Sequence, residues 1–227
     1  MKVSVVLPLG PDARSGWVSR ILDRLAEAGG FEVVCVDSSE DGEVPLLAGR
    51  CDRIVRLKTR SRGARLQAGI EASSGELILL HHPRSLIEAE GLRRLREDAD
   101  RLLWGGFTHA FDWDHPLLKL TSWYSNHVRA GLRGIVYLDH CVFFRRDLLT
   151  RPIPAVEIFE DTELSRILGE SAPPALLPFV STTSAVRFRS NGLWRQAFLN
   201  ARLKLEYLLG RGDREMNARY ERGLGLN

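Results

Sequence analysis

Residues 3–37, "VSVVLPLGPDARSGWVSRILDRLAEAGGFEVVCVD", decide the fold. The first seven and the last seven of these residues are valine-rich runs that are too short for a helix, and each is typical of a buried strand. Between them, apolar residues recur at helical spacing from Val18 to Leu25, and a pair of glycines ends that helix. Two strands joined through a helix in this way are predicted to pair in parallel, with a right-handed crossover.

The alternation of strand and helix continues to about residue 100. Further strands are predicted over residues 53–59 and 76–82, and helices over residues 63–75 and 88–102. The sequence therefore predicts the α/β class, with a Rossmann-like, doubly wound, mostly parallel central sheet. Ligands of such sheets bind beyond the carboxyl ends of the strands. The residues expected to meet in that crevice are Pro8, Leu9, Asp37, Ser38, His81 and His82.

The second half of the chain is less regular. Its predicted elements are strands over residues 102–113 and 140–147, helices over residues 115–132 and 160–170, and an extended segment over residues 174–189. A long helix is predicted over residues 192–210, and the polar residues after Gly212 are expected to be loosely held. These patterns predict one α/β domain over residues 1–190 and a helical C-terminal extension over residues 191–227.

Composition limits the class of protein. Apolar residues make up 44% of the 227 positions, which is typical of a globular protein. The chain has no apolar run long enough for a membrane-spanning helix, and its start lacks the long apolar segment of a signal peptide. The three cysteines form no metal-binding pair, and Cys35 lies within an apolar strand, as a buried thiol does. We therefore expect a cytoplasmic protein.

Basic residues are concentrated in two segments. Residues 50–65 hold seven basic residues and one acidic residue, and residues 186–227 hold nine and four, whereas the rest of the chain is acidic overall. Such segments suit a phosphate, an anionic membrane or a nucleic acid, and they also occur as solvated surfaces. Neither segment has the interleaved aromatic residues or the recognition motif of a nucleic-acid binder, so we expect no nucleic acid as a partner.

Three short stretches carry side chains suited to a bound nucleotide. Asp37 ends a strand, where its carboxylate can accept hydrogen bonds from a base or a ribose, although turns also favour aspartate. Arg62 and Gly63 begin a helix, and a helix N-terminus beside a guanidinium suits a diphosphate, unless the arginine is simply solvated. Arg187 belongs to the predicted extended segment with Phe188 on its other side, where it either closes over a phosphate or belongs to an edge strand.

The stretch "EIFEDTELSRIL", residues 157–168, places several acidic residues at the start of a predicted helix. The positive end of the helix dipole favours acidic residues there without any chemistry. The catalytic alternative is that the carboxylate of Asp161 acts as a general base and removes a proton from an attacking hydroxyl.

The order of the motifs is more specific than any one of them. The stretches "SRGARLQAG", "LHHPRS", "GGF", "YLDHCVFFRR", "FEDTEL" and "VRFRSNG" follow one another along the chain. In this order they resemble family 2 glycosyltransferases of the GT-A fold, and most closely a small bacterial branch encoded near radical-SAM and arsenosugar biosynthesis genes. The corresponding motifs of that branch read "GRARQMNAG", "LHADT", "GGF", "YGDQ-IFVRR", "MEDVEL" and "RRWERRG". The resemblance covers roughly Val3 to Tyr220.

The resemblance implies an enzyme of the hexosyltransferase type, which moves a sugar from a nucleotide diphosphate sugar to an acceptor with inversion. It implies that Asp161 is the catalytic base and that Glu160 supports it. Asp37 would contact the base or ribose, Arg62 would lie by the diphosphate, and Arg187 with the C-terminal helices would form part of the donor lid or of the acceptor side. The expected donor-binding residues are Pro8, Leu9, Asp37, Arg62, His81 and Arg187.

The chain departs from the family pattern in three places. The Asn-Glu that commonly follows the first strand is replaced by Gly10, Pro11 and Asp12, and the first arginine and the aromatic residue of "RRW" fall on Val186 and Phe188. The third departure concerns the metal. The acidic residue of "LHADT", which would hold Mn²⁺ or Mg²⁺, falls on Pro83, which has no ligand atom. Three explanations remain open: an enzyme active without the usual metal, a metal held instead through His81 or His82, and a catalytically degenerate protein that acts by binding or as a scaffold. In the first case the cations available to the leaving diphosphate are Arg84, Arg62 and Arg187.

The long C-terminal helix has a broad apolar stripe with basic residues beside it. The stripe consists of Trp194, Ala197, Phe198, Ala201, Leu205, Leu208 and Leu209. Such a helix packs on its own domain, on a second copy of the chain, or on an anionic membrane. We expect protein to cover the stripe, either the domain itself or the partner in a homodimer, and the alternative is a peripheral contact with the inner membrane.

Overall fold

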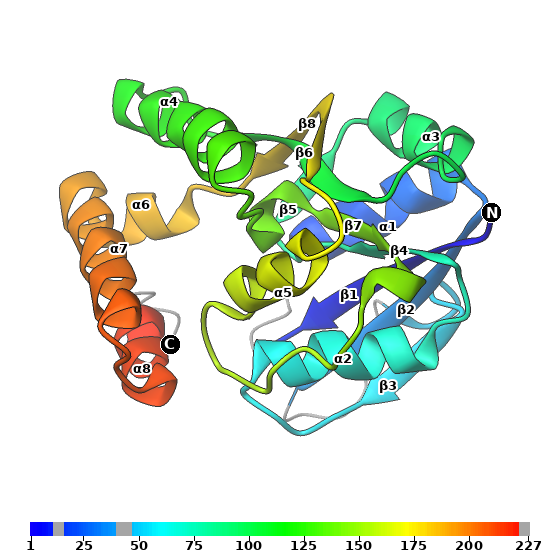
Figure 1. Ribbon diagram of the computed structural model, residues 1–227, viewed down its shortest axis with the longest axis horizontal. Helices are drawn as coiled ribbons and strands as arrows, with labels where there is room; N and C mark the ends of the chain where they lie inside the picture. The colour runs from blue at the N-terminus through cyan, green and yellow to red at the C-terminus, as the bar shows by residue number, and fades with distance from the viewer. Residues whose placement is uncertain (11–15, 40–46, 223–227) are drawn as a thin grey trace.

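The computed structural model describes the backbone of residues 1–10, 16–39 and 47–222. Within these residues, eight strands form one sheet in the order β3-β2-β1-β4-β7-β6-β8-β5, and helices cover both faces (Figure 1). The strands are β1 (Val3–Leu9), β2 (Phe31–Asp37), β3 (Arg53–Arg56), β4 (Leu77–Leu80), β5 (Ser85–Ile87), β6 (Trp104–Phe111), β7 (Val142–Arg145) and β8 (Ala175–Thr183). The α-helices are α1 (Gly16–Ala28), α2 (Arg62–Ala72), α3 (Ala89–Glu97), α4 (Pro116–Trp123), α5 (Glu160–Gly169), α6 (Val186–Asn191), α7 (Leu193–Leu208) and α8 (Asp213–Arg222).

The first half of the sheet is parallel, as predicted. β1 pairs in parallel with both β2 and β4, and β2 pairs in parallel with β3. The register places Leu9 opposite Asp37 at the carboxyl ends of β1 and β2. The N–H of His81, just after β4, donates to the carbonyl oxygen of Val6 in β1. The ends of these three strands therefore lie at one edge of the sheet.

The second half of the sheet mixes directions. β7 is antiparallel to β4 and β6, β6 is parallel to β8, and β5, which the sequence did not predict, is antiparallel to β8. The predicted long helix over residues 115–132 begins as α4 and continues as η2, a π-helix over Tyr124–Leu132. The α/β class and the mostly parallel sheet are confirmed.

Two apolar clusters cover the two faces of the sheet. One joins alternate residues of β1 to α1 and α3, and it includes all four apolar residues predicted between Val18 and Leu25. The other joins Val6 of β1 to Leu66 of α2 and Leu164 of α5. Successive residues of a strand point to opposite faces, so a fully apolar β1 requires helices on both sides.

The segment after β8 is helical, and our prediction of an extended stretch over residues 174–189 is wrong at its end. The N–H of Ala185 donates to the Asp112 carboxylate at 2.7 Å, which turns the chain away from the sheet. Phe188 of α6 is then buried in a cluster with Leu118 of α4. Burial of this one aromatic ring requires the helical turn, because an extended continuation of β8 would not bring the ring back to α4.

Residues 213–222 form α8, so the prediction of a loosely held tail is wrong for that range, and the rest of the tail lies outside the described residues. Met216 of α8 is buried with Ile158, Phe159 and Leu203. This cluster packs α7 and α8 against the segment that precedes α5, at the left of Figure 1. A single buried methionine in a strongly polar stretch gave no periodic signal in the sequence.

α7 packs through a face other than the predicted one. Leu199, Leu203 and Tyr207 form its inner apolar strip, and Gln196 and Glu206 are buried beside them. The helix therefore has two apolar faces, and the sequence pattern favoured the broader one.

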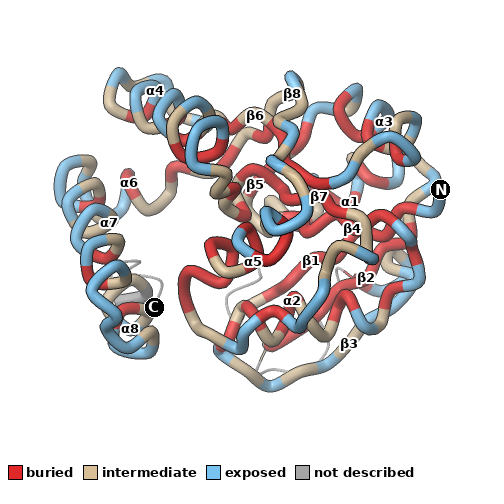
Figure 2. The backbone as a smooth tube through the Cα atoms, in the orientation of Figure 1, coloured by how far each residue is buried: buried red, intermediate tan, exposed pale blue. Residues whose placement is uncertain are grey.

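The predicted apolar stripe of α7 is exposed to solvent, so the expectation that its own domain covers the stripe is wrong. Trp194 is 72% exposed and Phe198 is 74% exposed. Exposed stretches recur along the whole of α7 (Figure 2). The other exposed members of the stripe are Ala201, Leu205, Leu208 and Leu209. Within the described part of the chain, no helix combines the length and the apolar character needed to cross a membrane.

Candidate functional site

The residues predicted to line a crevice lie at the carboxyl edge of the parallel strands. Pro8 and Leu9 end β1 and are buried, and Asp37 ends β2 beside them. The Asp37 carboxylate accepts a hydrogen bond from the N–H of Ser39 at 2.9 Å. His81 is buried at the end of β4. The structure therefore brings these four predicted residues to one edge, and their contact with a donor stays a prediction.

Arg62 begins α2 at the same edge. Ser61 caps the helix, because its hydroxyl accepts from the N–H of Ala64 at 3.0 Å and lies 2.9 Å from the carbonyl oxygen of Val156. Gly63 has no side chain to separate α2 from the incoming segment: an added Cβ atom would lie 2.2 Å from the carbonyl oxygen of Pro154. The Ser-Arg-Gly motif thus places the start of α2 directly against the segment that leads into α5.

This approach joins Arg62 to the acidic pair of α5. The Nε of Arg62 donates to the Glu160 carboxylate, and its Nη2 lies 3.7 Å from Oδ2 of Asp161. Both carboxylates are buried. Arg62 is therefore an ion-paired residue, and the alternative of a solvated surface arginine is wrong. Phe159, which precedes the pair, has a left-handed backbone with φ of 64°, and such conformations in non-glycine residues cluster at functional sites.

Asp161 is a buried acid with a perturbed proton affinity. Burial and the neighbouring charge of Glu160 raise its pKa to about 7, against the opposing effects of Arg62 and of the N–H of Leu138. That N–H donates to Oδ2 of Asp161 at 3.1 Å. An acid that titrates near neutral pH can take a proton from a hydroxyl and release it again.

Asp139 lies beside this pair, and we did not single it out from the sequence. It belongs to η3, a short 3₁₀-helix over Leu138–His140, and it directly follows the residue that holds Asp161. Burial opposes its ionisation, but His109 and Arg129 outweigh burial and hold its pKa well below the usual range. The sequence offered only the aspartate in "YLDHC". An aspartate beside a predicted strand is equally typical of a turn, so the sequence did not mark it as a site residue.

The histidines that follow β4 are neutral. Burial lowers the pKa of His81 to about 4, and burial together with Arg62 lowers that of His82 well below its usual value. Nδ1 of His81 lies 3.0 Å from the carbonyl oxygen of His82, so it carries the proton. Nδ1 of His82 accepts from the N–H of Arg84 at 3.3 Å.

These residues do not fit a Mn²⁺ or Mg²⁺ ion at the position where the resemblance places one. Pro83 has no ligand atom, and its neighbours offer imidazole nitrogen, whereas both ions prefer oxygen ligands. Each histidine has its Nδ1 engaged with its own loop. Across the described residues, no three His, Cys, Asp or Glu side chains are grouped so that they could hold an ion.

Arg187 lies in α6 and joins that helix to α8. Its Nη1 donates to the carbonyl oxygen of Tyr220 at 2.8 Å, and its guanidinium lies 3.8 Å from the centre of the Tyr220 ring. Tyr220 is close enough to Arg62 to act on its charge, after Glu160 and Asp161. The C-terminal helices therefore reach the site through Tyr220, and the role of Arg187 as part of a donor lid stays a prediction.

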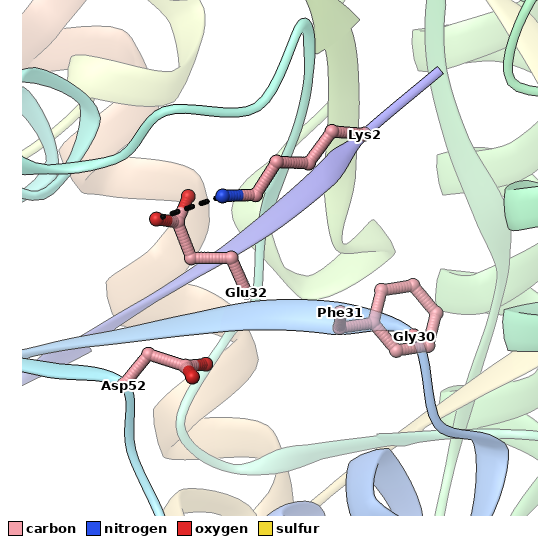
Figure 3. Close-up of a pocket in the computed structure, with 5 residues that line it drawn as sticks. All are labelled: Lys2, Gly30, Phe31, Glu32 and Asp52. Atoms are coloured by element: carbon pink, nitrogen blue, oxygen red, sulfur yellow. Dashed lines mark ion pairs between the residues drawn. The ribbon is translucent and has the colours of Figure 1, made fainter.

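A separate hollow opens at the amino ends of β1 and β2, away from the site (Figure 3). Lys2 forms an ion pair with Glu32 there at 3.3 Å. Burial opposes the ionisation of Glu32, but hydrogen bonds from Ser4 and Ser74 outweigh it and lower its pKa to about 2. Glu32 thus ties the start of β2 to its neighbours, and its polar atoms are engaged in that structural task.

Known proteins match this chain in fold rather than in sequence. No protein-family model matches the sequence, and no curated protein matches it. The solved structure of TarS from S. aureus aligns over 94% of this chain with a TM-score of 0.65 and 16% identity, and a complex of its residues 1–349 with UDP-GlcNAc aligns over 81% with a TM-score of 0.62 and 18% identity. The mannosyltransferase PcManGT from Pyrobaculum calidifontis, solved with GDP-Man and Mn²⁺, aligns over 89% with a TM-score of 0.63 and 19% identity.

The chain spans only part of these proteins. It covers 40% of the TarS chain, 58% of the TarS 1–349 chain and 61% of the PcManGT chain. What is shared is the mixed α/β fold with one curled, mostly parallel sheet and its helices. The chain therefore has the GT-A fold found in nucleotide-sugar glycosyltransferases.

Proposed function

We propose that the protein transfers a sugar from a nucleotide diphosphate sugar to an acceptor hydroxyl, with inversion at the anomeric carbon. The observation that carries this proposal is the buried Glu160–Asp161 pair, held against Arg62 at the carboxyl edge of a GT-A sheet. A pKa of about 7 suits Asp161 to act as base at neutral pH.

In this proposal Asp161 takes the proton of the acceptor hydroxyl. The acceptor oxygen forms a bond to the anomeric carbon while the bond from that carbon to the diphosphate oxygen breaks, and the nucleoside diphosphate leaves with the bonding electrons. Arg62 keeps Asp161 in place, because it is paired with both carboxylates. Glu160 supports the base by raising its proton affinity.

We further propose that Arg84 balances the charge of the leaving diphosphate. Arg84 follows Pro83 directly, and its charge is felt by His82 at the same loop. A fixed cation can stabilise a developing negative charge as a metal ion does.

A binding experiment tests the donor class. Thermal unfolding is measured with UDP-GlcNAc, UDP-Glc and GDP-Man, each with and without Mn²⁺, and release of the nucleoside diphosphate is followed in the same samples. A donor at 100 times its Kd stabilises the protein by about 2.7 kcal/mol. Stabilisation together with release supports the transferase, binding without release supports the degenerate binding protein, and no binding of any nucleotide sugar contradicts both.

We propose that the exposed stripe of α7 lies on an anionic membrane surface. Its side chains include two aromatic residues, Trp194 and Phe198, which suit the boundary between headgroups and acyl chains. The one acidic residue of α7, which is described throughout, is Glu206, and it is buried. The exposed arginines beside the stripe are Arg195, Arg211 and Arg202, of which Arg202 is paired with Glu206 at 2.9 Å.

The charge of this face favours a membrane over a second copy of the chain. A two-fold dimer through the stripe would bring its arginines against themselves, whereas an anionic lipid surface attracts them. Peripheral attachment to the inner membrane would also place the site near lipid-linked acceptors, which the family resemblance allows.

A further inference from the structure

A second cluster of polar side chains lies beside the Arg62–Glu160–Asp161 group, and the proposed transfer step leaves it unused. Its members come from β6, η2 and η3. They are His109, Ser125, Arg129, Asp139 and His140, and all except Asp139 are buried. Buried polar groups of this number are costly unless they are paired, so their arrangement calls for a physical explanation.

The rear of the cluster is a hydrogen-bond chain. Arg129 donates to the hydroxyl of Ser125, and that hydroxyl lies 2.7 Å from Nε2 of His140. Nδ1 of His140 lies 2.8 Å from the carbonyl oxygen of Phe107. Because a carbonyl oxygen only accepts, Nδ1 carries the proton and Nε2 accepts from Ser125. His140 is therefore fixed and neutral, and Gly106 makes room for it, since an added Cβ atom there would lie 2.9 Å from Cβ of His140.

The backbone of Asp139 is held equally firmly. Its carbonyl oxygen lies 2.9 Å from the hydroxyl of Ser181, 3.3 Å from that of Thr183 and 3.4 Å from that of Ser85. Two residues later, Cys141 has a left-handed backbone with φ of 52°. Strained backbone that is held by surrounding contacts is typical of sites where one side chain must be placed accurately.

The carboxylate of Asp139 is surrounded by donors that do not reach it. Nη2 of Arg129 lies 3.7 Å from Oδ1, and Nε2 of His109 lies 3.6 Å from Oδ2, which is beyond hydrogen-bond distance. Among the described residues, neither Oδ1 of Asp139 nor either ring nitrogen of His109 has a hydrogen-bond partner. The Asp139 side chain is 26% exposed. Oδ1 is itself buried, so a ligand can reach only the exposed part of the Asp139 side chain.

Asp139 lies between the two ends of the proposed reaction, because its charge acts on both His82 and Asp161 and its backbone is connected to both. On one side, the hydroxyl of Ser85 links Asp139 to His82, since it lies 3.0 Å from Nδ1 of that histidine. On the other side, Leu138 holds Asp161. The loop of His82 would lie by the diphosphate, and Asp161 would be the base. In a displacement at the anomeric carbon, the transferred sugar must lie between the leaving group and the base.

We propose that Asp139 binds a hydroxyl group of the transferred sugar and so contributes to the choice of donor. An ionised carboxylate only accepts hydrogen bonds, so the group that it binds must be a donor, as a sugar hydroxyl is. A second anion would be repelled by the carboxylate, and a metal cation by Arg129. The inference rests on the proposed function, because it needs a nucleotide sugar in the crevice.

The test compares a nucleotide sugar with the nucleotide alone. Kd values of UDP-GlcNAc and UDP, and of GDP-Man and GDP, are measured by calorimetry for the wild type, Asp139→Asn and the surface control Asp147→Asn. For the pair that the wild type binds, Asp139→Asn should raise the ratio of the two dissociation constants by about tenfold or more, since a hydrogen bond to a charged group is lost. The Kd of the nucleotide alone and both values of the control should not change.

The outcomes separate the inference from the proposed function. If the wild type binds none of UDP-GlcNAc, UDP-Glc and GDP-Man, the proposed function fails and the inference fails with it. If the wild type binds but Asp139→Asn weakens the nucleotide and the nucleotide sugar equally, or weakens neither, the inference alone is overturned. Should Asp139→Asn fail to fold, Asp139→Glu keeps the charge but moves the carboxylate, and an unchanged ratio in that variant overturns the inference as well.

Discussion

The Nε of Arg62 donates to the carboxylate of Glu160, which lies 98 positions later in the chain. This contact joins the first residue of α2 to the first residue of α5. The parallel half of the sheet, which carries α2, is thereby fixed to the helix that carries Asp161. This ion pair therefore helps to position the two halves of the proposed site, and a substitution of either residue should disturb both halves.

The first prediction concerns pH. Asp161 must be ionised to act as base, and its pKa is about 7. Turnover, measured as release of the nucleoside diphosphate from the nucleotide sugar, should therefore fall about tenfold per pH unit below that value. Glu160 raises this pKa by its negative charge. Glu160→Gln should therefore move the acidic limb of the pH–rate profile to lower pH.

The matched control is Glu163→Gln, which removes from the same helical turn an acid whose carboxylate is paired with Arg166 at 2.7 Å. It should leave the midpoint of the acidic limb in place. A profile that is flat from about pH 5 to 8, or a limb that moves to higher pH in Glu160→Gln, would contradict the assignment of Asp161 as the titrating base.

Gly63→Ala should disrupt the site without touching any charge. The new Cβ atom would lie 2.2 Å from the carbonyl oxygen of Pro154, so the segment before α5 must move. Overpacking of this kind costs about 1–3 kcal/mol of unfolding free energy, measured by urea denaturation, and turnover should fall because Glu160 moves away from Arg62. Gly16→Ala is the control, because nothing lies within 4 Å of the added atom. It should lower neither the free energy of unfolding nor turnover. Equal stability of the two variants would refute the close approach.

Arg84 provides a test of how the leaving group is stabilised. If a protein cation replaces the metal, turnover of the wild type should survive EDTA, and Arg84→Gln should lower it by about a hundredfold. Arg93→Gln, which removes an exposed arginine from α3, is the control and should leave turnover unchanged. Loss of turnover in EDTA with recovery on added Mn²⁺ would show that a metal is required and that Pro83 does not exclude it.

The stripe of α7 is tested by sedimentation with vesicles that contain phosphatidylserine. The wild type should pellet at low salt and less at high salt, because salt screens its arginines. Trp194→Ser combined with Phe198→Ser should reduce the pelleted fraction by more than about tenfold, since two large apolar side chains are removed from the interface. Leu132→Ser, which changes an exposed leucine outside α7, is the matched control.

Two results would overturn the membrane proposal. One is a wild type that stays in the supernatant at both salt concentrations. The other is a wild-type dimer in sedimentation equilibrium that the α7 variant converts to a monomer, because a second copy of the chain would then cover the stripe.

Sequence periodicity predicted the parallel half of the fold well, for a physical reason. Strands buried on both faces are continuously apolar, so β1 and β2 were predicted with their observed bounds. The glycine pair after α1 has positive φ at both positions, as a helix stop does. In this half of the chain, local pattern and tertiary structure agree.

Elements held by single tertiary contacts could not be predicted in this way. α6 exists because Phe188 is buried against α4, and α8 because Met216 is buried against α7 and the segment before α5. The inner face of α7 was missed because the more apolar face points to solvent. A sequence pattern shows which side chains are apolar, but it does not show which of them pack against another part of the structure.

The site was predictable in part. The order of motifs selected Asp37, Arg62, Glu160 and Asp161, and the structure joins the last three through the ion pair. Asp139 was missed, because its place beside Asp161 depends on a backbone hydrogen bond from Leu138. No spacing in the sequence encodes that contact.

The most direct test of the central claim is Asp161→Asn. The variant keeps the shape of the side chain but cannot accept the proton of the acceptor hydroxyl, so it affects the transition state more than the ground state. With the nucleotide sugar that stabilises the wild type, we predict that its Kd changes by less than about threefold while turnover falls about 10²- to 10⁴-fold. Turnover within about tenfold of the wild type, with donor binding intact, would contradict the claim that Asp161 is the base.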